Sequence, residues 1–287
     1  LFIPLITPFD ESGAVALDVL ESLASEVLDA GARGLVALGT TGEPGALTAP
    51  EQRSVTDVAA RVCRDRRAPL LVGAHTPEQL RALGDRPEVV AALSVVPPFV
   101  RPGEAGVLAY FTQLAAASPV PLVVYDVPQR TGQYLSAATL ARLAAIPGVA
   151  GLKHAPGGIN SDTMTLLASP PAGLAILGGD DAFISPMLAL GAHGAILASA
   201  HIATASFARL AGLWQAGDVA AARRLGSELS ALSMALFAEP NPTVIKAVLH
   251  AQGRIPTPSV RLPLLPAHAD TAGAALRQAA LMSAPAS

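Results

Sequence analysis

A lysine inside an apolar stretch is the first feature of this sequence that points to chemistry. Only two of the 19 basic residues are lysines, and one of them, Lys153, lies in the apolar run 149–155. Such a lysine can carry its ammonium to solvent or pair with an acid. Alternatively, burial lowers the lysine pKa from about 10.4 and yields a neutral amine that attacks carbonyl groups. Position alone leaves both interpretations open. The other lysine, Lys246, is predicted to lie on a helix and to be solvated.

Tyr125 ends another apolar run, at residues 121–127, and is one of only three tyrosines. It can fill the core with its hydroxyl satisfied at the rim. It can also relay protons beside Lys153 if the two runs are neighbouring strands.

Two loop motifs contain groups that bind anions. In GTTGE, residues 39–43, glycines flank Thr40 and Thr41, so backbone N–H groups and hydroxyls can converge on a carboxylate or phosphate. Arg130 follows the Tyr125 run and can bind a carboxylate with two hydrogen bonds. An ordinary turn and a solvated arginine are the simpler alternatives.

Eight short apolar runs alternate with helix-like segments and must position these residues. The runs are nearly continuous rather than alternating, as in parallel strands covered by helices. We predict strands at residues 3–7, 34–39, 69–74, 89–97, 121–127, 149–155, 174–179 and 194–199. Helices are predicted at residues 18–30, 49–64, 77–84, 103–117, 136–146, 159–169, 181–190 and 204–216. Capping-box patterns at residues 18–21 and 48–51 mark two helix starts, and Asp180 and Asp181 are predicted to cap the seventh helix.

Eight βα units predict a (β/α)8 TIM barrel over residues 1–216, with a C-terminal helical extension over residues 217–287. The extension is expected to hold helices at 218–237, 242–252 and 267–282. The competing architecture is an open doubly wound sheet, which the unit count and the lack of a dinucleotide fingerprint disfavour. In a barrel, the active site lies at the C-terminal ends of the strands.

Composition excludes several classes of protein. A net charge of −3 argues against a nucleic-acid binder, and no apolar run is long enough for a membrane helix. The single cysteine, Cys63, excludes an intramolecular disulfide and a Cys-rich zinc site. The histidines lack metal-ligand spacing. No signal-peptide pattern is visible, so we expect a cytoplasmic globular protein.

The motifs together resemble the dihydrodipicolinate synthase / N-acetylneuraminate lyase family of pyruvate-dependent class I aldolases. The resemblance covers nearly the whole chain. It is carried by ITPF at 6–9, GTTGE at 39–43, YDVPQRTG at 125–132, GLK at 151–153, GGDD at 178–181, GAHG at 191–194 and EPNP at 239–242. It implies a lyase built on a barrel with a helical C-terminal extension, assembled as a homotetramer that is a dimer of dimers.

The resemblance also implies roles for individual residues. Lys153 matches the lysine that forms an imine with pyruvate. Thr40 and Thr41 match the pair that binds the pyruvate carboxylate, and Thr40 also joins a proton relay. Tyr125 matches the tyrosine that shuttles protons during imine and carbon–carbon bond formation.

Three further positions match the family. Gly179 and Ile196 match backbone positions that line the lysine. Arg130 matches the arginine that, in the synthase branch of lysine biosynthesis, binds the carboxylate of aspartate semialdehyde. No metal or organic cofactor is implied, because the protonated imine is itself the electron sink.

The sequence departs from the family at three places. The synthase branch usually has a Tyr-Tyr pair after the fourth strand, whose second tyrosine reaches the neighbouring subunit's relay; this chain has Phe99 in a segment without tyrosine. Phe99 can fill the space but cannot carry a proton, and the nearest tyrosine is Tyr110. His154 replaces an acidic residue and Asp126 replaces an asparagine, changes expected to retune the pocket for the second substrate.

These observations predict an enzyme that condenses pyruvate with an aldehyde, with dihydrodipicolinate synthase as the leading reaction. The missing tyrosine keeps a second reaction open, that of a 2-oxoacid or 2-keto-3-deoxy sugar acid aldolase or dehydratase. A third hypothesis is a catalytically reduced paralogue that binds 2-oxo acids.

Overall fold

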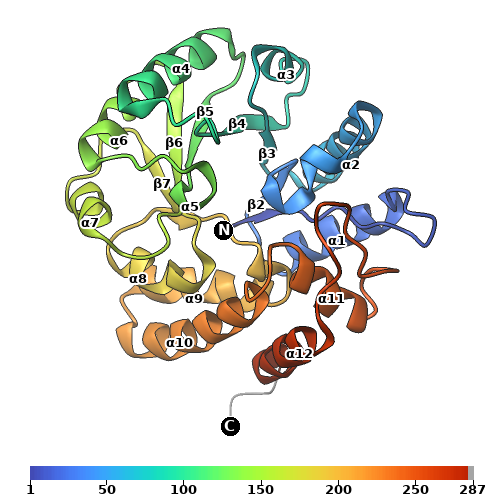
Figure 1. Cartoon of the computed structure of the whole chain (residues 1–287). Helices are drawn as coiled ribbons and strands as arrows, with labels where there is room; N and C mark the ends of the chain where they lie inside the picture. The colour runs from blue at the N-terminus through green and yellow to red at the C-terminus, as the bar shows by residue number, and fades with distance from the viewer. Residues whose placement is uncertain (284–287) are drawn as a thin grey trace.

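The computed structural model describes residues 1–283 and shows a barrel of eight parallel strands (Figure 1). The strands are β1 (Phe2–Pro4), β2 (Gly34–Ala37), β3 (Leu70–Gly73), β4 (Val89–Val95), β5 (Leu122–Asp126), β6 (Val149–His154), β7 (Ala175–Gly178) and β8 (Gly194–Ala195). They pair in chain order, and a parallel bridge between Phe2 and Ile196 joins the last strand to the first. The predicted TIM barrel is confirmed, and the open doubly wound sheet is excluded because its strand order would not be sequential.

Helices surround the barrel and return the chain from each strand to the next (Figure 1). They are α1 (Leu17–Asp29), α2 (Ala49–Arg66), α3 (Pro77–Arg81), α4 (Gly103–Ala117), α5 (Pro128–Thr131), α6 (Ala137–Ala144), α7 (Ser161–Ala168), α8 (Ile184–Ala189) and α9 (Thr204–Ala216). The predicted helices are present, and α3, α6, α7 and α8 are shorter than expected. The helix α5 was not predicted.

Side-chain capping marks the starts of helices α2 and α3 but not that of α1. Thr48 and Thr76 each accept a hydrogen bond from the backbone three residues later and complete a capping box. The capping box expected at residues 18–21 is wrong. The helix α1 begins one residue earlier, at Leu17, after Ala16, which has no side chain to cap it.

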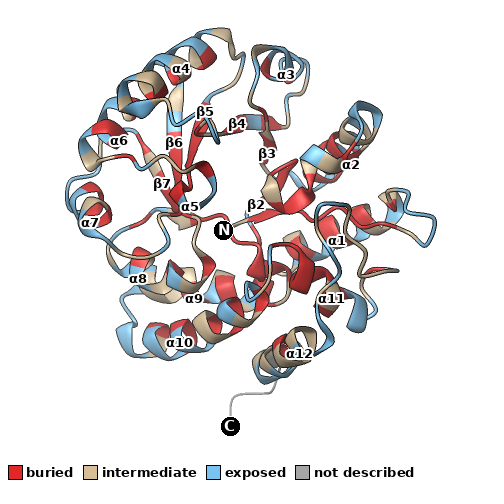
Figure 2. Ribbon diagram, in the orientation of Figure 1, coloured by how far each residue is buried: buried red, intermediate tan, exposed pale blue. Residues whose placement is uncertain are grey.

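Buried residues concentrate on the strands and on parts of the surrounding helices (Figure 2), and the apolar ones form two clusters. The larger cluster lies between the strands and the surrounding helices. A smaller one fills the barrel and consists of Val36, Leu71, Ala91, Leu93, Val123, Tyr125, Val127, Ala155, Leu177 and Ile196. Tyr125 therefore points inward, which places a phenol inside the barrel.

The C-terminal helices are α10 (Val219–Leu236), α11 (Thr243–Ala251) and α12 (Ala269–Ser283). The helix α10 packs against α8, α9 and α12, and α11 packs against α12. Across residues 1–283, none of the helices combines the length and apolar character needed to cross a membrane.

Barrel closure buries a histidine, His201, just after β8. Its Nε2 accepts a hydrogen bond from the backbone N–H of Ile6, and its Nδ1 lies 3.1 Å from the carbonyl oxygen of Ala198. Because Nε2 accepts, the neutral imidazole carries its proton on Nδ1. Burial is the main cause that lowers the pKa of His201 to about 3.

We expect this histidine to make the fold sensitive to acid. Between pH 6.5 and about 3, His201 binds a proton in the unfolded chain but not in the folded chain. The free energy of unfolding therefore decreases as the pH is lowered through this range. Because one proton is involved, His201 changes the free energy of unfolding by at most about 1.4 kcal/mol per pH unit. Urea unfolding at several pH values should show a shallower pH dependence for His201→Gln than for wild type. The control His268→Gln removes an exposed imidazole; an equal change in that control would refute the assignment.

Candidate active site

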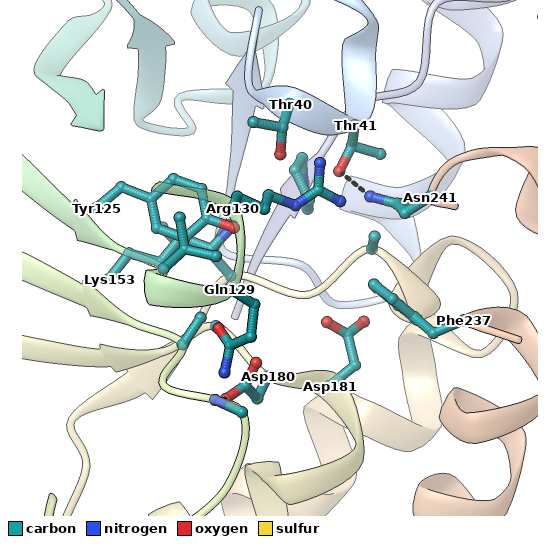
Figure 3. A pocket seen from close by; sticks show the side chains of 17 residues that line it. Thr40, Thr41, Tyr125, Gln129, Arg130, Lys153, Asp180, Asp181, Phe237 and Asn241 are labelled. Atoms are coloured by element: carbon teal, nitrogen blue, oxygen red, sulfur yellow. Dashed lines mark hydrogen bonds between the residues drawn. The ribbon is translucent and has the colours of Figure 1, made fainter. Parts of the chain in front are cut away.

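Lys153 and Tyr125 lie side by side at the C-terminal end of the barrel. They face each other in the register of β5 and β6, and Lys153 Nζ is 4.1 Å from the centre of the Tyr125 ring. The two residues are only 5% and 6% exposed. Figure 3 shows both side chains reaching the same cavity from neighbouring strands. The amine is thus enclosed and has a phenol next to it.

A glycine at the end of the neighbouring strand β7 leaves room for the Lys153 side chain. Gly179 directly follows β7, and a Cβ atom placed there would lie 2.9 Å from Cε of Lys153. Real Cβ contacts are never that short, so any side chain at this position would displace the lysine. Glycine is required here by close approach rather than by backbone conformation.

The threonine pair forms a short turn after β2. Thr40 and Thr41 open the 3-10 turn Thr40–Gly42. The side chain of Asn241 donates a hydrogen bond of 2.9 Å to Thr41 Oγ1, shown as a dashed line in Figure 3. Gly73 of the next strand is needed here too, because an added Cβ would lie 2.0 Å from the carbonyl oxygen of Leu38. The turn is therefore held by close packing of the preceding residue Leu38 against β3 and by a hydrogen bond from the C-terminal extension.

One cavity of about 210 Å³ collects these groups. Its lining residues are Pro4, Thr40, Thr41, Tyr125, Val127, Gln129, Arg130, Lys153, Ala155, Gly157, Gly179, Asp180, Asp181, Ile196, Ala198, Phe237 and Asn241. All seven site residues predicted from the sequence are among them. Arg130 comes from the short helix α5 and is exposed, so it lies at the rim, whereas Lys153 and Ile196 are buried.

Sequence reasoning missed several residues of the cavity. Asn241 is 8% exposed, and its Oδ1 is buried without a partner among the described residues. Asn241 lies in the EPNP motif at 239–242, which contributes to the family resemblance, but the sequence analysis assigned no function to this motif. Gln129 and Phe237 also line the cavity; Gln129 lies in the YDVPQRTG motif, whereas no residue pattern pointed to Phe237.

Two acidic residues occupy the wall next to the lysine, and the expected capping role is wrong for both. The carboxylate of Asp180 accepts a hydrogen bond from the backbone N–H of Gly157, and that of Asp181 accepts one from Ser199. Neither caps the following turn. Burial raises the pKa of both carboxyls, that of Asp181 to about 6. The wall therefore holds carboxylates that are partly desolvated.

Asp126 and His154 do not line this cavity, and their expected effect on the second-substrate pocket stays a prediction. They follow Tyr125 and Lys153 in the chain, and successive side chains of a strand point to opposite faces. They consequently lie outside the barrel wall, where Nδ1 of His154 is 2.9 Å from Asp126 Oδ2 and Nε2 is 2.9 Å from Thr163 Oγ1.

Two other expectations need correction or refinement. Lys246 is not solvated; it is fully buried and forms an ion pair with Glu43. Phe99 is 91% exposed and does not line the cavity of its own chain. Tyr110 is no substitute for the missing relay hydroxyl, because it donates a hydrogen bond to the carbonyl of His75.

The part of the chain that the structure describes contains no cluster of three or more His, Cys, Asp or Glu side chains suited to a metal ion. The reactive groups of the cavity are an amine, a phenol, hydroxyls, an arginine and carboxylates. An amine and a phenol at this distance suit imine formation with a carbonyl compound, and hydroxyls with an arginine suit carboxylate recognition.

The chain is similar to known proteins over almost its entire length. The family model described as "Dihydrodipicolinate synthetase family" matches residues 1–280. The 4-hydroxy-tetrahydrodipicolinate synthase of Neisseria gonorrhoeae is 35% identical over 269 residues, which cover 92% of this chain and 91% of that protein. The protein of the same name from Moorella thermoacetica is 34% identical and covers 97% of both chains.

Solved structures agree with this similarity. The dihydrodipicolinate synthase of Acinetobacter baumannii, described as chloride-inhibited and complexed with pyruvate, is 32% identical with a TM-score of 0.91, covering 97% of this chain and 98% of that one. The enzyme from Thermotoga maritima is 26% identical with a TM-score of 0.93, covering 98% and 97%. Fold, cavity chemistry and sequence similarity thus agree, and the chain belongs to the dihydrodipicolinate synthase family of lyases.

Proposed function

We propose that this protein condenses pyruvate with aspartate semialdehyde to form 4-hydroxy-tetrahydrodipicolinate. The observation that carries this proposal is the enclosed amine of Lys153, 4.1 Å from the Tyr125 ring, in one cavity with Thr40 and Thr41. The relatives named above support the same reaction.

The chemistry begins at Lys153. Its neutral amine attacks the ketone carbon of pyruvate, water leaves, and a protonated imine forms. The hydroxyl of Tyr125, whose ring lies beside the amine, shuttles protons for this step. Thr40 and Thr41 hold the pyruvate carboxylate, and Gly179 and Ile196 line the space around the lysine.

Carbon–carbon bond formation follows from the imine. The cationic nitrogen withdraws electrons, so the methyl carbon of pyruvate loses a proton and becomes a nucleophilic enamine. This carbon attacks the aldehyde of the second substrate, and the aldehyde oxygen takes up a proton. The amino group of the product then attacks the imine carbon, which closes a ring and releases Lys153.

Arg130 fits the second substrate better than the first. It is the cationic side chain at the exposed rim of the cavity, whereas the threonine pair lies deeper. We assign it the carboxylate of aspartate semialdehyde, which a guanidinium binds through two parallel hydrogen bonds.

The proposed reaction is tested by incubating the purified protein with pyruvate and aspartate semialdehyde and measuring pyruvate consumption together with product formation. The expected result is turnover with this pair. If it is absent and the protein instead releases pyruvate from a 2-keto-3-deoxy sugar acid, the chain is an aldolase of that second type, which the absent relay tyrosine favours. No turnover with any member of a 2-oxoacid panel would indicate the reduced, ligand-binding paralogue.

The assembly we propose is a homotetramer, a dimer of dimers, in the cytoplasm. Phe99 and Val100 are 91% and 76% exposed, and Phe99 adopts the left-handed φ of 67°. Exposed apolar side chains in a constrained loop are typical of an interface. We also treat residues 1–216 as the barrel and 217–287 as an extension of the same folding unit.

We expect Phe99→Tyr to increase kcat, because it supplies the hydroxyl that the relay of a neighbouring subunit lacks. General acid–base help is worth about 10²–10⁴-fold when fully positioned, so even partial positioning gives a measurable gain. Steady-state kinetics of Phe99→Tyr and Phe99→Leu separate a hydroxyl effect from a packing effect. Equal kcat values for both variants would count against the relay, and sedimentation analysis reports whether the tetramer persists.

A further inference from the structure

The second lysine of the chain, Lys246, is fully buried. Lys246 is 0% exposed, on α11. Its Nζ donates to Glu43 Oε1 at 2.5 Å and to the carbonyl oxygen of Ser259 at 2.8 Å, and lies 4.1 Å from the centre of the Phe9 ring. The ammonium is therefore fully partnered, and nothing in the proposed reaction uses it.

Its partner Glu43 directly follows the turn that carries the threonine pair. Glu43 is 6% exposed and adopts a left-handed φ of 54°, a conformation costly for a residue other than glycine. One carboxylate oxygen accepts from Lys246, and the other accepts from the backbone N–H of Arg261 at 2.8 Å. Both oxygens are thus held by the C-terminal extension.

The extension touches this turn at a second point, two residues away. There Asn241 donates to the hydroxyl of Thr41. Three hydrogen bonds from the extension therefore fix the segment between Thr41 and Glu43, and Thr41 lines the cavity.

Stability alone is a weak reason for such an ion pair. Taking two charges out of water costs several kcal/mol for each ion, and well-packed apolar residues often serve stability as well. A buried pair does, however, fix one geometry, because either charge left alone is strongly disfavoured. The position of this pair, between the extension and the turn, indicates what it fixes.

We propose that Lys246 is a positioning residue whose ion pair with Glu43 holds the Thr40–Thr41 turn in the geometry that receives the substrate carboxylate. This inference rests on the proposed function, because it takes the turn as the carboxylate site. It extends that function to a side chain that touches neither substrate.

The titration of Lys246 supplies a readout that a purely structural role lacks. Burial lowers the pKa of Lys246 to about 8, opposed by Glu43 and assisted by the nearby charge of Arg261. These are the charged groups that face it, since its other neighbours are the Phe9 ring and the Ser259 carbonyl. Above about pH 8 wild-type Lys246 loses its positive charge, and Glu43 is left without a cationic partner at this position, as it is in a variant without the amine.

The test measures how much pyruvate is needed to half-saturate borohydride trapping, at a temperature where circular dichroism shows each protein folded. We expect Lys246→Met to raise this concentration at pH 7 by about tenfold or more, within the roughly 10²-fold cost of a 1 Å misplacement. Trapping at saturating pyruvate should change less. The ratio of variant to wild type should fall toward one as the pH passes 8.

Glu43→Gln breaks the same pair from the other side and serves if Lys246→Met folds poorly. The double variant should match the single variants rather than the product of their effects, because the pair acts as a unit. The matched control is Glu26→Gln, which breaks the ion pair with Arg254 that also joins the C-terminal segment to the barrel but does not touch the turn.

The inference would be overturned if Lys246→Met and Glu43→Gln left the half-saturating pyruvate concentration unchanged. An equal increase of this concentration in Glu26→Gln would also overturn it. Wild-type protein that traps pyruvate without turning over aspartate semialdehyde refutes the synthase assignment alone, because the trapping series still measures the turn. Wild-type protein that traps no pyruvate overturns both.

Discussion

Lys153→Ala should abolish turnover and leave no pyruvate adduct after borohydride reduction. The amine is the nucleophile of the proposed mechanism, and removing a covalent nucleophile typically costs on the order of 10⁴-fold or more in kcat. The measurement is intact-protein mass spectrometry after incubation with pyruvate and borohydride, alongside the steady-state rate. Wild-type protein should gain one stable adduct.

The composition of the chain makes this experiment unusually specific. Lys246 is the other lysine, and it is fully buried against Glu43. An adduct on a lysine side chain of folded wild-type protein therefore reports Lys153, and peptide mapping verifies the position. A lysine adduct that persists in Lys153→Ala would refute the assignment of the nucleophile.

Tyr125→Phe should lower kcat by about 10²–10⁴-fold, the usual worth of general acid–base catalysis. The fold should survive, because the buried ring is retained. The Lys153 amine also keeps its contact with the ring. Imine trapping should then reach the wild-type extent, but more slowly.

Steady-state kinetics and the time course of borohydride trapping measure these two effects separately. Tyr134→Phe is the matched control, since Tyr134 is 68% exposed and does not line the cavity. A Tyr125→Phe enzyme with the wild-type rate would remove this residue from the relay.

The sequence predicted the barrel because parallel strands buried on both faces produce apolar runs that stand out from the segments between them. All eight strands occur where expected, although β8 spans only Gly194–Ala195, against an expectation of residues 194–199. The difference arises because Ile196 forms only an isolated bridge to Phe2, and the chain beyond it leaves the ladder at the cavity.

The candidate site was largely predictable for the same reason. Residues at the ends of barrel strands converge whatever the surrounding loops do, so Lys153, Tyr125 and the threonine pair were found by position. The outward direction of Asp126 and His154 was also within reach, because strand alternation places them opposite to Tyr125 and Lys153.

Lys246 shows what the sequence could not provide. A lone charged residue on a helix usually lies in solvent, and only the pairing with a carboxylate 203 positions earlier reverses this expectation. Asp181 was missed for a related reason: its environment is created by Ser199 and the cavity wall, which come from other parts of the chain.

The hydrogen bonds from Asn241 to Thr41 and from Lys246 to Glu43 also determine the order in which parts of the pocket can form during synthesis. A nascent chain that has left the ribosome only through α9 already carries its amine and its phenol, but not the residues that hold the turn. Residue 246 must emerge before the pocket is finished. Completion of the pocket therefore depends on α11, which is synthesised long after the strands that carry the amine and the phenol.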